Sequence, residues 1–216
     1  MVLVFLGFSG FFTWLYGNDI FLVGQANLKT FFTISSWTLF FFIPAITMKM
    51  IAEEKKSGTL ELILTKSISD RQFIIGKFLG AVSLVLVALV ATFPYVITLS
   101  LIGDLDNGGT ICGYFGLFLM TIAYAAIGIF SSSLTNNQIV AFMLSLVICL
   151  FFHIIFDVLA ANSSGIISWL FETLSLQTHF DSISRGVIDS RDLVYFISIT
   201  ILGLFSAELS LSKSHS

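Results

Sequence analysis

Charged residues are scarce in this chain. Only 11% of its 216 residues are Asp, Glu, Lys or Arg, whereas 56% are hydrophobic, and the mean hydropathy is +0.99. A soluble domain carries roughly a quarter of its residues as charged side chains, so this composition excludes an ordinary soluble domain. A disordered chain is excluded as well, because disorder requires low hydrophobicity. The composition therefore predicts a protein whose solvent is a lipid bilayer.

Cysteine and nucleotide-binding motifs are also scarce. The two cysteines, Cys112 and Cys149, lie in apolar runs and are interpreted as small buried hydrophobes. The phosphate-binding pattern G-x-x-x-x-G-K-[ST] does not occur in the sequence, which predicts that the chain does not itself bind ATP. The net charge of -3, without a basic stripe, gives no indication of nucleic-acid binding. The N-terminus has no basic region or cleavage site typical of a secretory signal.

Six apolar segments are candidates for membrane spans, because a spanning helix needs about 20 mostly apolar residues. They cover residues 2–16, 31–51, 73–102, 111–130, 139–161 and 193–211. We therefore predict an all-α integral membrane protein with one transmembrane domain over residues 1–216. The first segment is too short to span, so we expect its span to be truncated at the N-terminus.

Basic residues gather between the second and third predicted spans. Six of the ten lie in or beside this connection: Lys49, Lys55, Lys56, Lys66, Arg71 and Lys77. Because Lys and Arg accumulate in cytoplasmic loops, we expect this connection to be cytoplasmic. An even number of spans then places both termini in the cytoplasm.

Residues 49–71 carry nine of the 23 acidic and basic side chains. Gly58 is expected to end the helix that leaves the second span. One face of a short following helix is predicted from the i, i+3, i+4 spacing of Leu60, Ile63 and Leu64. Ser69 and Gln72 form a capping box that predicts the start of the next helix. This block is either a membrane-surface loop held by anionic lipid or a stiff docking element for a soluble partner.

The connection between the last two predicted spans, residues 162–192, is semi-apolar. Its hydrophobic side chains suit water poorly and are too few to cross a bilayer: Trp169, Leu170, Phe171, Leu174 and Leu176. We predict a re-entrant or interfacial helical hairpin on the outer face, with Trp169 at headgroup depth. Four charged residues of this connection either form a solvated loop with local ion pairs or meet an exported partner: Arg185, Asp189, Arg191 and Asp192.

Polar residues within the spans and turns give further candidates. His153 and Asp157 are four residues apart in the fifth span, and an ionisable pair on one helix face is a candidate relay or metal pair. No third ligand or nucleophile stands nearby in the sequence. The uncharged run SSSLTNN, residues 131–137, predicts a tight turn whose Asn residues cap the fifth span or touch a partner. Two G-x-x-x-G motifs predict close helix packing, within the chain or across a dimer: Gly76/Gly80 and Gly109/Gly113.

The stretch IPAITMKMIAEEKKSGTLELILTKSISDRQFIIGKFLGA, residues 43–81, resembles the signature of ABC-2-type transporter permeases. The matching residues are Glu53, Glu54, Gly58, Thr59, Leu60, Glu61, Leu62, Leu64, Gly76 and Lys77. Two further stretches, YAAIGIFSSSLTNNQIVAF (124–142) and HFDSISRGVIDSRDLVYF (179–196), are similar to the branch associated with bacterial gliding motility. The resemblance covers nearly the whole chain.

This resemblance implies six transmembrane helices, a cytoplasmic coupling helix between the second and third spans, and an outer re-entrant hairpin. It also implies a permease subunit in the bacterial inner membrane that works as an exporter without enzymatic activity or a cofactor of its own. The implied partners are a separate ABC-type ATPase that binds ATP, a second permease copy or paralogue, and an exported accessory protein. The residues expected to couple to the ATPase are Glu53, Glu54, Gly58, Thr59, Leu60, Glu61, Ile63 and Leu64, with Lys55 and Lys56 completing a polar rim. Family members usually begin with a cytoplasmic amphipathic segment, which does not precede the first span here.

Three functional hypotheses follow. The first is a transport subunit that is coupled to an ATPase through residues 52–64. The second is a membrane enzyme that uses His153, Asp157 or acids on the outer side. The third is a membrane scaffold within a gliding or secretion machine, whose function would not depend on ATP hydrolysis by a partner.

Overall fold

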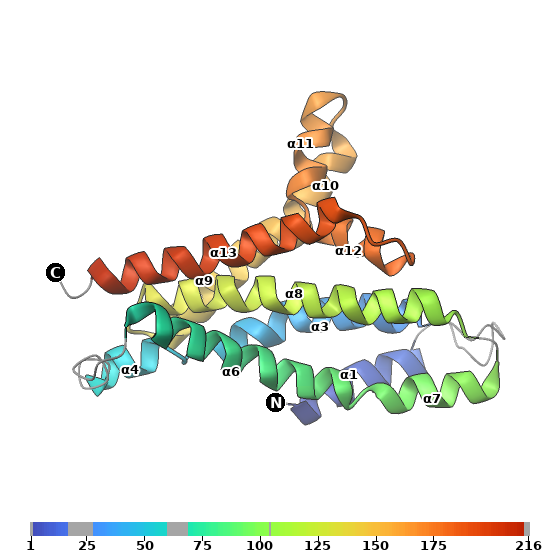
Figure 1. The fold of residues 1–216 in the computed structure, drawn as a ribbon, viewed down its shortest axis with the longest axis horizontal. Helices are drawn as coiled ribbons and strands as arrows, with labels where there is room; N and C mark the ends of the chain where they lie inside the picture. The colour runs from blue at the N-terminus through green and yellow to red at the C-terminus, as the bar shows by residue number, and fades with distance from the viewer. Residues whose placement is uncertain (1, 17–27, 60–68, 104, 214–216) are drawn as a thin grey trace.

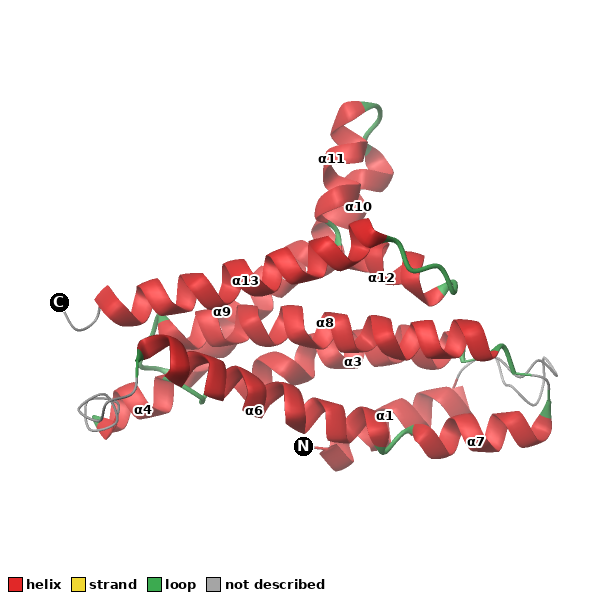
Figure 2. Ribbon diagram, viewed as in Figure 1, coloured by secondary structure: helices red, strands yellow, loops and turns green. Residues whose placement is uncertain are grey.

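A computed structural model describes residues 2–16, 28–59, 69–103 and 105–213 (Figure 1). Within these ranges the chain forms helices and contains no strand (Figure 2), as expected for a backbone that must satisfy its own hydrogen bonds in lipid. Five helical segments are long and apolar enough to cross a membrane: Lys29–Ser57, Asp70–Ile102, Asn107–Ser133, Gln138–Asn162 and Ser190–Lys213. The all-α prediction is thereby confirmed for the described residues, and the five candidate spans agree with a multi-pass membrane protein.

The first predicted span is a shorter apolar helix, Val2–Trp14. It comprises α1 (Val2–Phe11) and the first part of the π-helical turn η1 (Phe12–Tyr16). Phe5 of α1 is fully buried, and its ring lies 5.7 Å from that of Phe42. The hydroxyl of Tyr95 donates to the Leu6 carbonyl at 3.2 Å. The segment therefore packs on the bundle, but the count of six spans stays a prediction.

Helix α8 (Asn107–Ser133) lies at the centre of the bundle and is buried along most of its length. It packs against α3 (Lys29–Thr47), α6 (Asp70–Val90), α9 (Gln138–Leu150), α12 (Leu176–Ser184) and α13 (Ser190–Lys213). Small residues allow this close approach. A Cβ atom on Gly203 of α13 would lie only 3.0 Å from the backbone of Ala126, and one on Gly128 would overlap Thr47 of α3.

The third predicted span is two helices rather than one. Helix α6 ends at Val90, and α7 (Phe93–Ile102) begins after a turn. Pro94 lies in the first turn of α7, where its missing N–H would have no intrahelical partner in any case. Pro44 lies inside α3, one turn before that helix ends at Thr47. Each proline therefore lies within about one turn of a helix end.

The fifth span bends before it reaches the outer connection. Helix α9 continues through the π-helical turn η2 (Phe151–Ile155) into α10 (Phe156–Asn162), and α11 (Ile166–Leu174) folds back along α10. Figure 1 shows the α10–α11 pair projecting from the bundle across its long axis. The ring of Phe171 stacks on that of Phe156 with centroids 6.1 Å apart, while Trp169 is 62% exposed. The helical character of this region is confirmed, and its re-entrant insertion stays a prediction.

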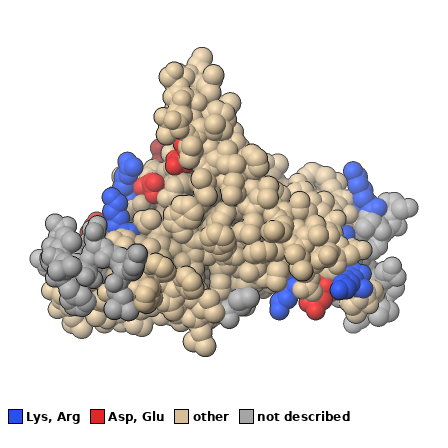
Figure 3. Space-filling model, turned by 180° about the vertical axis from the view of Figure 1, so that it is seen from behind, with Lys and Arg blue, Asp and Glu red and all other residues tan. Residues whose placement is uncertain are grey.

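Charged side chains gather at the two ends of the bundle. Figure 3 shows Lys, Arg, Asp and Glu near both ends of one face, with a wide uncharged belt between them. Charged groups are costly in the hydrocarbon core and are stable at the membrane surfaces. This distribution fits a bundle whose long axis crosses the bilayer.

Candidate functional site

The charged block begins as α4 (Ala52–Ser57), at the end of the bundle where α8 and α13 end (Figure 1). Four predicted coupling residues lie in the described part of the chain: Glu53, Glu54, Gly58 and Thr59. The other four lie outside it: Leu60, Glu61, Ile63 and Leu64. Gly58 adopts a left-handed conformation with φ of 70° and ends α4, as the sequence predicts. Glycine is the residue that adopts this conformation without steric strain.

A single hydroxyl of α8 holds the beginning of α4. The Ser132 hydroxyl accepts hydrogen bonds from the N–H groups of Ile51 at 3.1 Å and Ala52 at 3.0 Å. It also donates to the Met48 carbonyl at 3.0 Å. The first N–H groups of a helix have no intrahelical acceptor, and Ile51 supplies no side-chain cap to α4. Ser132 therefore caps α4 from a neighbouring helix and is itself fully buried.

The side of α4 is tied to α6 by an ion pair. The Glu54 carboxylate contacts the Lys77 ammonium, and their side chains are only 22% and 29% exposed. The same ammonium lies 5.3 Å from the centre of the Phe73 ring. Partly buried pairs of this kind are screened less by salt than exposed pairs. Glu54 is thus turned toward the bundle, whereas its neighbour Glu53 is exposed.

The last carbonyl groups of α8 provide a third attachment. The Lys55 ammonium donates to the Ser133 carbonyl at 2.5 Å, and the Ser210 hydroxyl of α13 donates to the same oxygen at 3.1 Å. Basic groups are favourable at a helix C-terminus, where carbonyl groups lack intrahelical donors. These attachments of α4 are called the α4 anchor below, and it consists of Glu54, Lys55, Lys77, Ser132, Ser133 and Ser210.

An apolar cluster accompanies the α4 anchor. Its buried members come from the α3–α4 connection, α6, α8 and α13: Ile51, Phe73, Ile74, Ile129, Ala207 and Leu211. The start of α6 is fixed locally by the predicted capping box, in which the Gln72 N–H donates to the Ser69 hydroxyl at 3.3 Å and the Ser69 N–H donates to Gln72 Oε1 at 3.2 Å. Four segments of the chain therefore meet where the α4 anchor and this apolar cluster lie side by side.

A shallow hollow of about 540 Å³ lies beside the end of α4. Its lining residues are Lys56, Leu134, Thr135, Asn136 and Asn137. Asn137 accepts a hydrogen bond from the Ile139 N–H at 3.0 Å and caps α9, as predicted. Leu134 is 50% exposed, which leaves an apolar side chain open at a polar surface. The run SSSLTNN was expected to be one turn, but Ser131–Ser133 form the last turn of α8.

The candidate pairing of His153 with Asp157 does not occur among the contacts of the described residues. His153 Nδ1 lies 2.8 Å from the hydroxyl of Tyr124, and Asp157 instead accepts from Thr178 at 3.4 Å. His153 lies in the π-helical turn η2, and a π-turn disrupts the regular i, i+4 spacing that the prediction assumed. The imidazole is 2% exposed and is packed between the rings of Trp37 and Phe40.

No metal site replaces that pair, because no group of three His, Cys, Asp or Glu residues suited to a metal ion occurs among the residues that the structure describes.

The two G-x-x-x-G motifs differ in how closely their glycines approach neighbouring atoms. A Cβ atom on Gly76 or Gly80 would meet no atom within 4 Å in the described ranges, whereas one on Gly113 would overlap the Phe32 ring. Close packing within the chain is confirmed at Gly113 alone of these three glycines.

The outer connection contains a buried pair that the sequence did not reveal. Asp192 was expected in a solvated loop, but it is buried, and its carboxylate lies 2.6 Å from Nδ1 of His179. The His179 ring stacks on that of Tyr195 at 4.0 Å. Asp189 is exposed as expected. The backbone N–H of Arg191 donates a hydrogen bond to the Asp189 carboxylate at 3.0 Å and thereby lowers the pKa of Asp189. The order of these acids along the chain gave no signal of which one is buried.

A known protein family matches most of this chain. The model of a family described as ABC-2 family transporter protein matches residues 16–207. The matched range includes α4 and most of the residues that anchor it. A search of curated proteins finds no match.

Proposed function

The chain belongs to the ABC-2 transporter family, and from this premise we propose that it is the permease subunit of an ATP-powered exporter whose α4 region couples to a separate ATPase. Members of this family are membrane subunits of transporters, are not themselves catalytic, and generally work with an ATPase subunit and as dimers. The membrane-spanning helices agree with a multi-pass permease.

The observation that carries the proposal is the α4 anchor. A partner that moves α4 also moves the backbone at Ile51 and Ala52, which is hydrogen-bonded to Ser132 of the central helix α8. The ion pair between Glu54 and Lys77 carries the same displacement to α6. Displacements of packed helices are a common way in which proteins switch between two states. A surface loop held only by lipid would not require these connections to three helices.

The docking surface in this proposal combines α4 with the segment that follows it. The residues that we expect to enter a cleft on the ATPase are Leu60, Ile63 and Leu64, which lie outside the described part of the chain. Glu53 in the first turn of α4 is exposed, as are Gly58 and Thr59 after its end. These residues would form the polar rim together with Lys56. ATP then binds to the partner subunit, and its hydrolysis there supplies the motive force.

The finer assignments are part of the same proposal. We place the protein in a bacterial inner membrane with the α4 end and both termini in the cytoplasm, because six of the ten basic residues belong to or flank the α4 region. The likeness of residues 124–142 and 179–196 supports a role in gliding motility. A second permease copy or paralogue and an exported accessory protein complete the complex.

The direct test is a pull-down of the affinity-tagged chain from mild detergent, followed by identification of the co-purified ATPase by mass spectrometry. We expect Leu60→Asp to remove the ATPase while the permease stays in the membrane, because a carboxylate at an apolar contact is left buried without a partner. Lys213→Asp, which places an acid in the last turn of α13 at the same end of the bundle, is the control and should retain it. Retention of the ATPase by Leu60→Asp would count against the proposal.

A further inference from the structure

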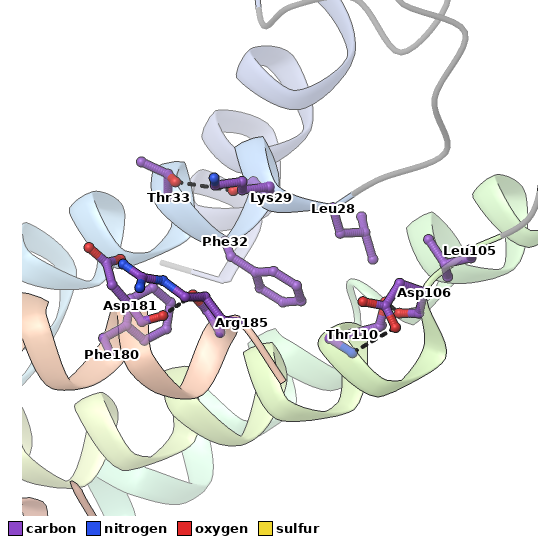
Figure 4. A pocket seen from close by; sticks show the side chains of 12 residues that line it. Leu28, Lys29, Phe32, Thr33, Leu105, Asp106, Thr110, Phe180, Asp181 and Arg185 are labelled. Carbon is purple, nitrogen blue, oxygen red and sulfur yellow. Dashed lines mark hydrogen bonds between the residues drawn. The ribbon is translucent and has the colours of Figure 1, made fainter. Parts of the chain in front are cut away.

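The end of the bundle opposite α4 (Figure 1) contains a cavity of about 390 Å³ (Figure 4). It opens between the first turns of α3 and α8 and the last turn of α12. Four charged side chains from these elements line it: Lys29, Asp106, Asp181 and Arg185. Two basic and two acidic groups thus face one space, at the end of the spans where lipid headgroups lie.

The floor of the cavity is aromatic. Phe32 of α3 and Phe180 of α12 are buried and lie against the glycine face of α8, where a Cβ atom on Gly116 would be 3.0 Å from the Phe180 ring. Figure 4 shows Phe32 pointing into the space between Arg185 and Asp106. The cavity therefore combines an apolar floor with a charged rim, as an amphipathic ligand requires.

The basic side of the rim is suited to a phosphate group. The guanidinium of Arg185 is exposed and makes no hydrogen bond or ion pair with the residues that the structure describes. A guanidinium binds phosphate through two parallel N–H donors. Lys29, at the beginning of α3, adds a second positive charge to the same cavity.

Asp181, which lies beside Arg185 in Figure 4, is suited to a primary ammonium group. Asp181 accepts one hydrogen bond from Gln177 at 3.0 Å, and burial raises the pKa of its carboxyl group. The positive charges of Arg185 and Lys29 act in the opposite direction and lower this pKa. An ammonium group in the cavity would favour the ionised form further, because it adds another opposite charge. Asp106 accepts from the Gly109 N–H at 3.0 Å and lies on the other side of Phe32 (Figure 4).

We propose that this cavity binds the headgroup of a phospholipid that carries both a phosphate and a primary ammonium group, as phosphatidylethanolamine does. The phosphate contacts Arg185 and Lys29, the ammonium contacts Asp181, and the acyl chains extend from the cavity toward the hydrocarbon core. A quaternary ammonium cannot donate hydrogen bonds to carboxylates, so the site prefers an ethanolamine headgroup to a choline headgroup. This inference does not depend on the coupling to an ATPase.

The test uses the purified full chain in a maltoside detergent and a series of short-chain lipids. Dihexanoyl phosphatidylethanolamine is compared with the phosphatidylcholine and phosphatidylglycerol of the same chain length, and with free phosphoethanolamine. The readout is the thermal unfolding midpoint followed by intrinsic fluorescence. At about 100 times its Kd, the ethanolamine lipid should raise the midpoint by about 5 °C or more, because it binds only the folded state.

The variants identify the groups involved. Arg185→Gln and Asp181→Asn should each weaken binding of the ethanolamine lipid about tenfold, the effect of losing one charge-assisted hydrogen bond. Arg191→Gln and Asp189→Asn change exposed residues of the same connection that do not line the cavity, and should bind as the unmodified chain does. Equal stabilisation by all three lipids, or unchanged binding by both cavity variants, would overturn the proposal. Binding of free phosphoethanolamine as tightly as the lipid would overturn the assignment to a lipid.

Discussion

Ser132→Ala provides the sharpest test of how α4 is held. The substitution removes the acceptor of the Ile51 and Ala52 N–H groups, which belong to fully buried residues, and the donor to the Met48 carbonyl. A buried polar group left without a partner costs about 1–3 kcal/mol. The two N–H groups together should therefore destabilise the docked conformation of α4 by at least about 2 kcal/mol.

Hydrogen–deuterium exchange measures this effect directly. A change of about 2 kcal/mol corresponds to roughly a 30-fold change in an equilibrium constant, so the amides of α4 should exchange about 30 times faster if they exchange by local opening. Peptides that cover residues 48–58 report on these amides. The change should be confined to this region, because Ser132 also lies in the last turn of α8, whose other hydrogen bonds remain.

The neighbouring serines provide matched controls. The hydroxyls of Ser131 and Ser133 are also buried, but they donate to carbonyl groups of their own helix, at 2.9 Å and 2.7 Å. Ser131→Ala and Ser133→Ala should therefore leave exchange in residues 48–58 nearly unchanged, and Ser132→Thr should preserve part of the protection. If Ser132→Ala exchanges like the two controls, the hydroxyl does not hold α4, and the reasoning from the α4 anchor fails.

Three further predictions follow from the contacts described above. In a double-mutant cycle, Glu54→Gln and Lys77→Gln should show a coupling free energy of about 1 kcal/mol, measured by thermal unfolding, and strict additivity would show that the ion pair contributes nothing. Gly203→Val should lower stability by about 1–3 kcal/mol because α13 must move away from α8, whereas Gly76→Ala, which meets no neighbour among the described residues, should not. Because burial raises the pKa of Asp181 in the folded state, stability should fall as the pH rises from the unfolded value of about 3.9 through the raised folded value. Asp181→Asn should remove this dependence, and an unchanged pH profile would contradict the assignment.

Much of the architecture is predictable because it depends on neighbours within a few residues. Apolar runs long enough for a bilayer predict the long helices, since backbone groups in lipid must pair within the helix. Gly58 ends α4 and the Ser69–Gln72 capping box begins α6, as expected from spacing alone. Asn137 likewise caps α9. These features require no information about distant parts of the chain.

The contacts of the α4 anchor were not predictable in the same way. Ser132 contacts Met48, Ile51 and Ala52 across sequence separations of 80 to 84 residues, and nothing in the run SSS distinguishes it from its neighbours. The Glu54–Lys77 contact joins two residues that the sequence did not pair with one another. Helix packing decides such pairs, because it alone determines which faces of two helices meet.

The sequence by itself thus determined the lipid environment of this protein, the positions of most helices and the helix ends that are set by local capping. The tertiary structure alone decided that His153 meets Tyr124 and not Asp157, and that Asp192 is buried beside His179. It also brought the charges of α3, α8 and α12 around one cavity. The physical reason is range: capping and hydrophobic periodicity act within about one helical turn, whereas burial and polar pairing depend on which helices pack together.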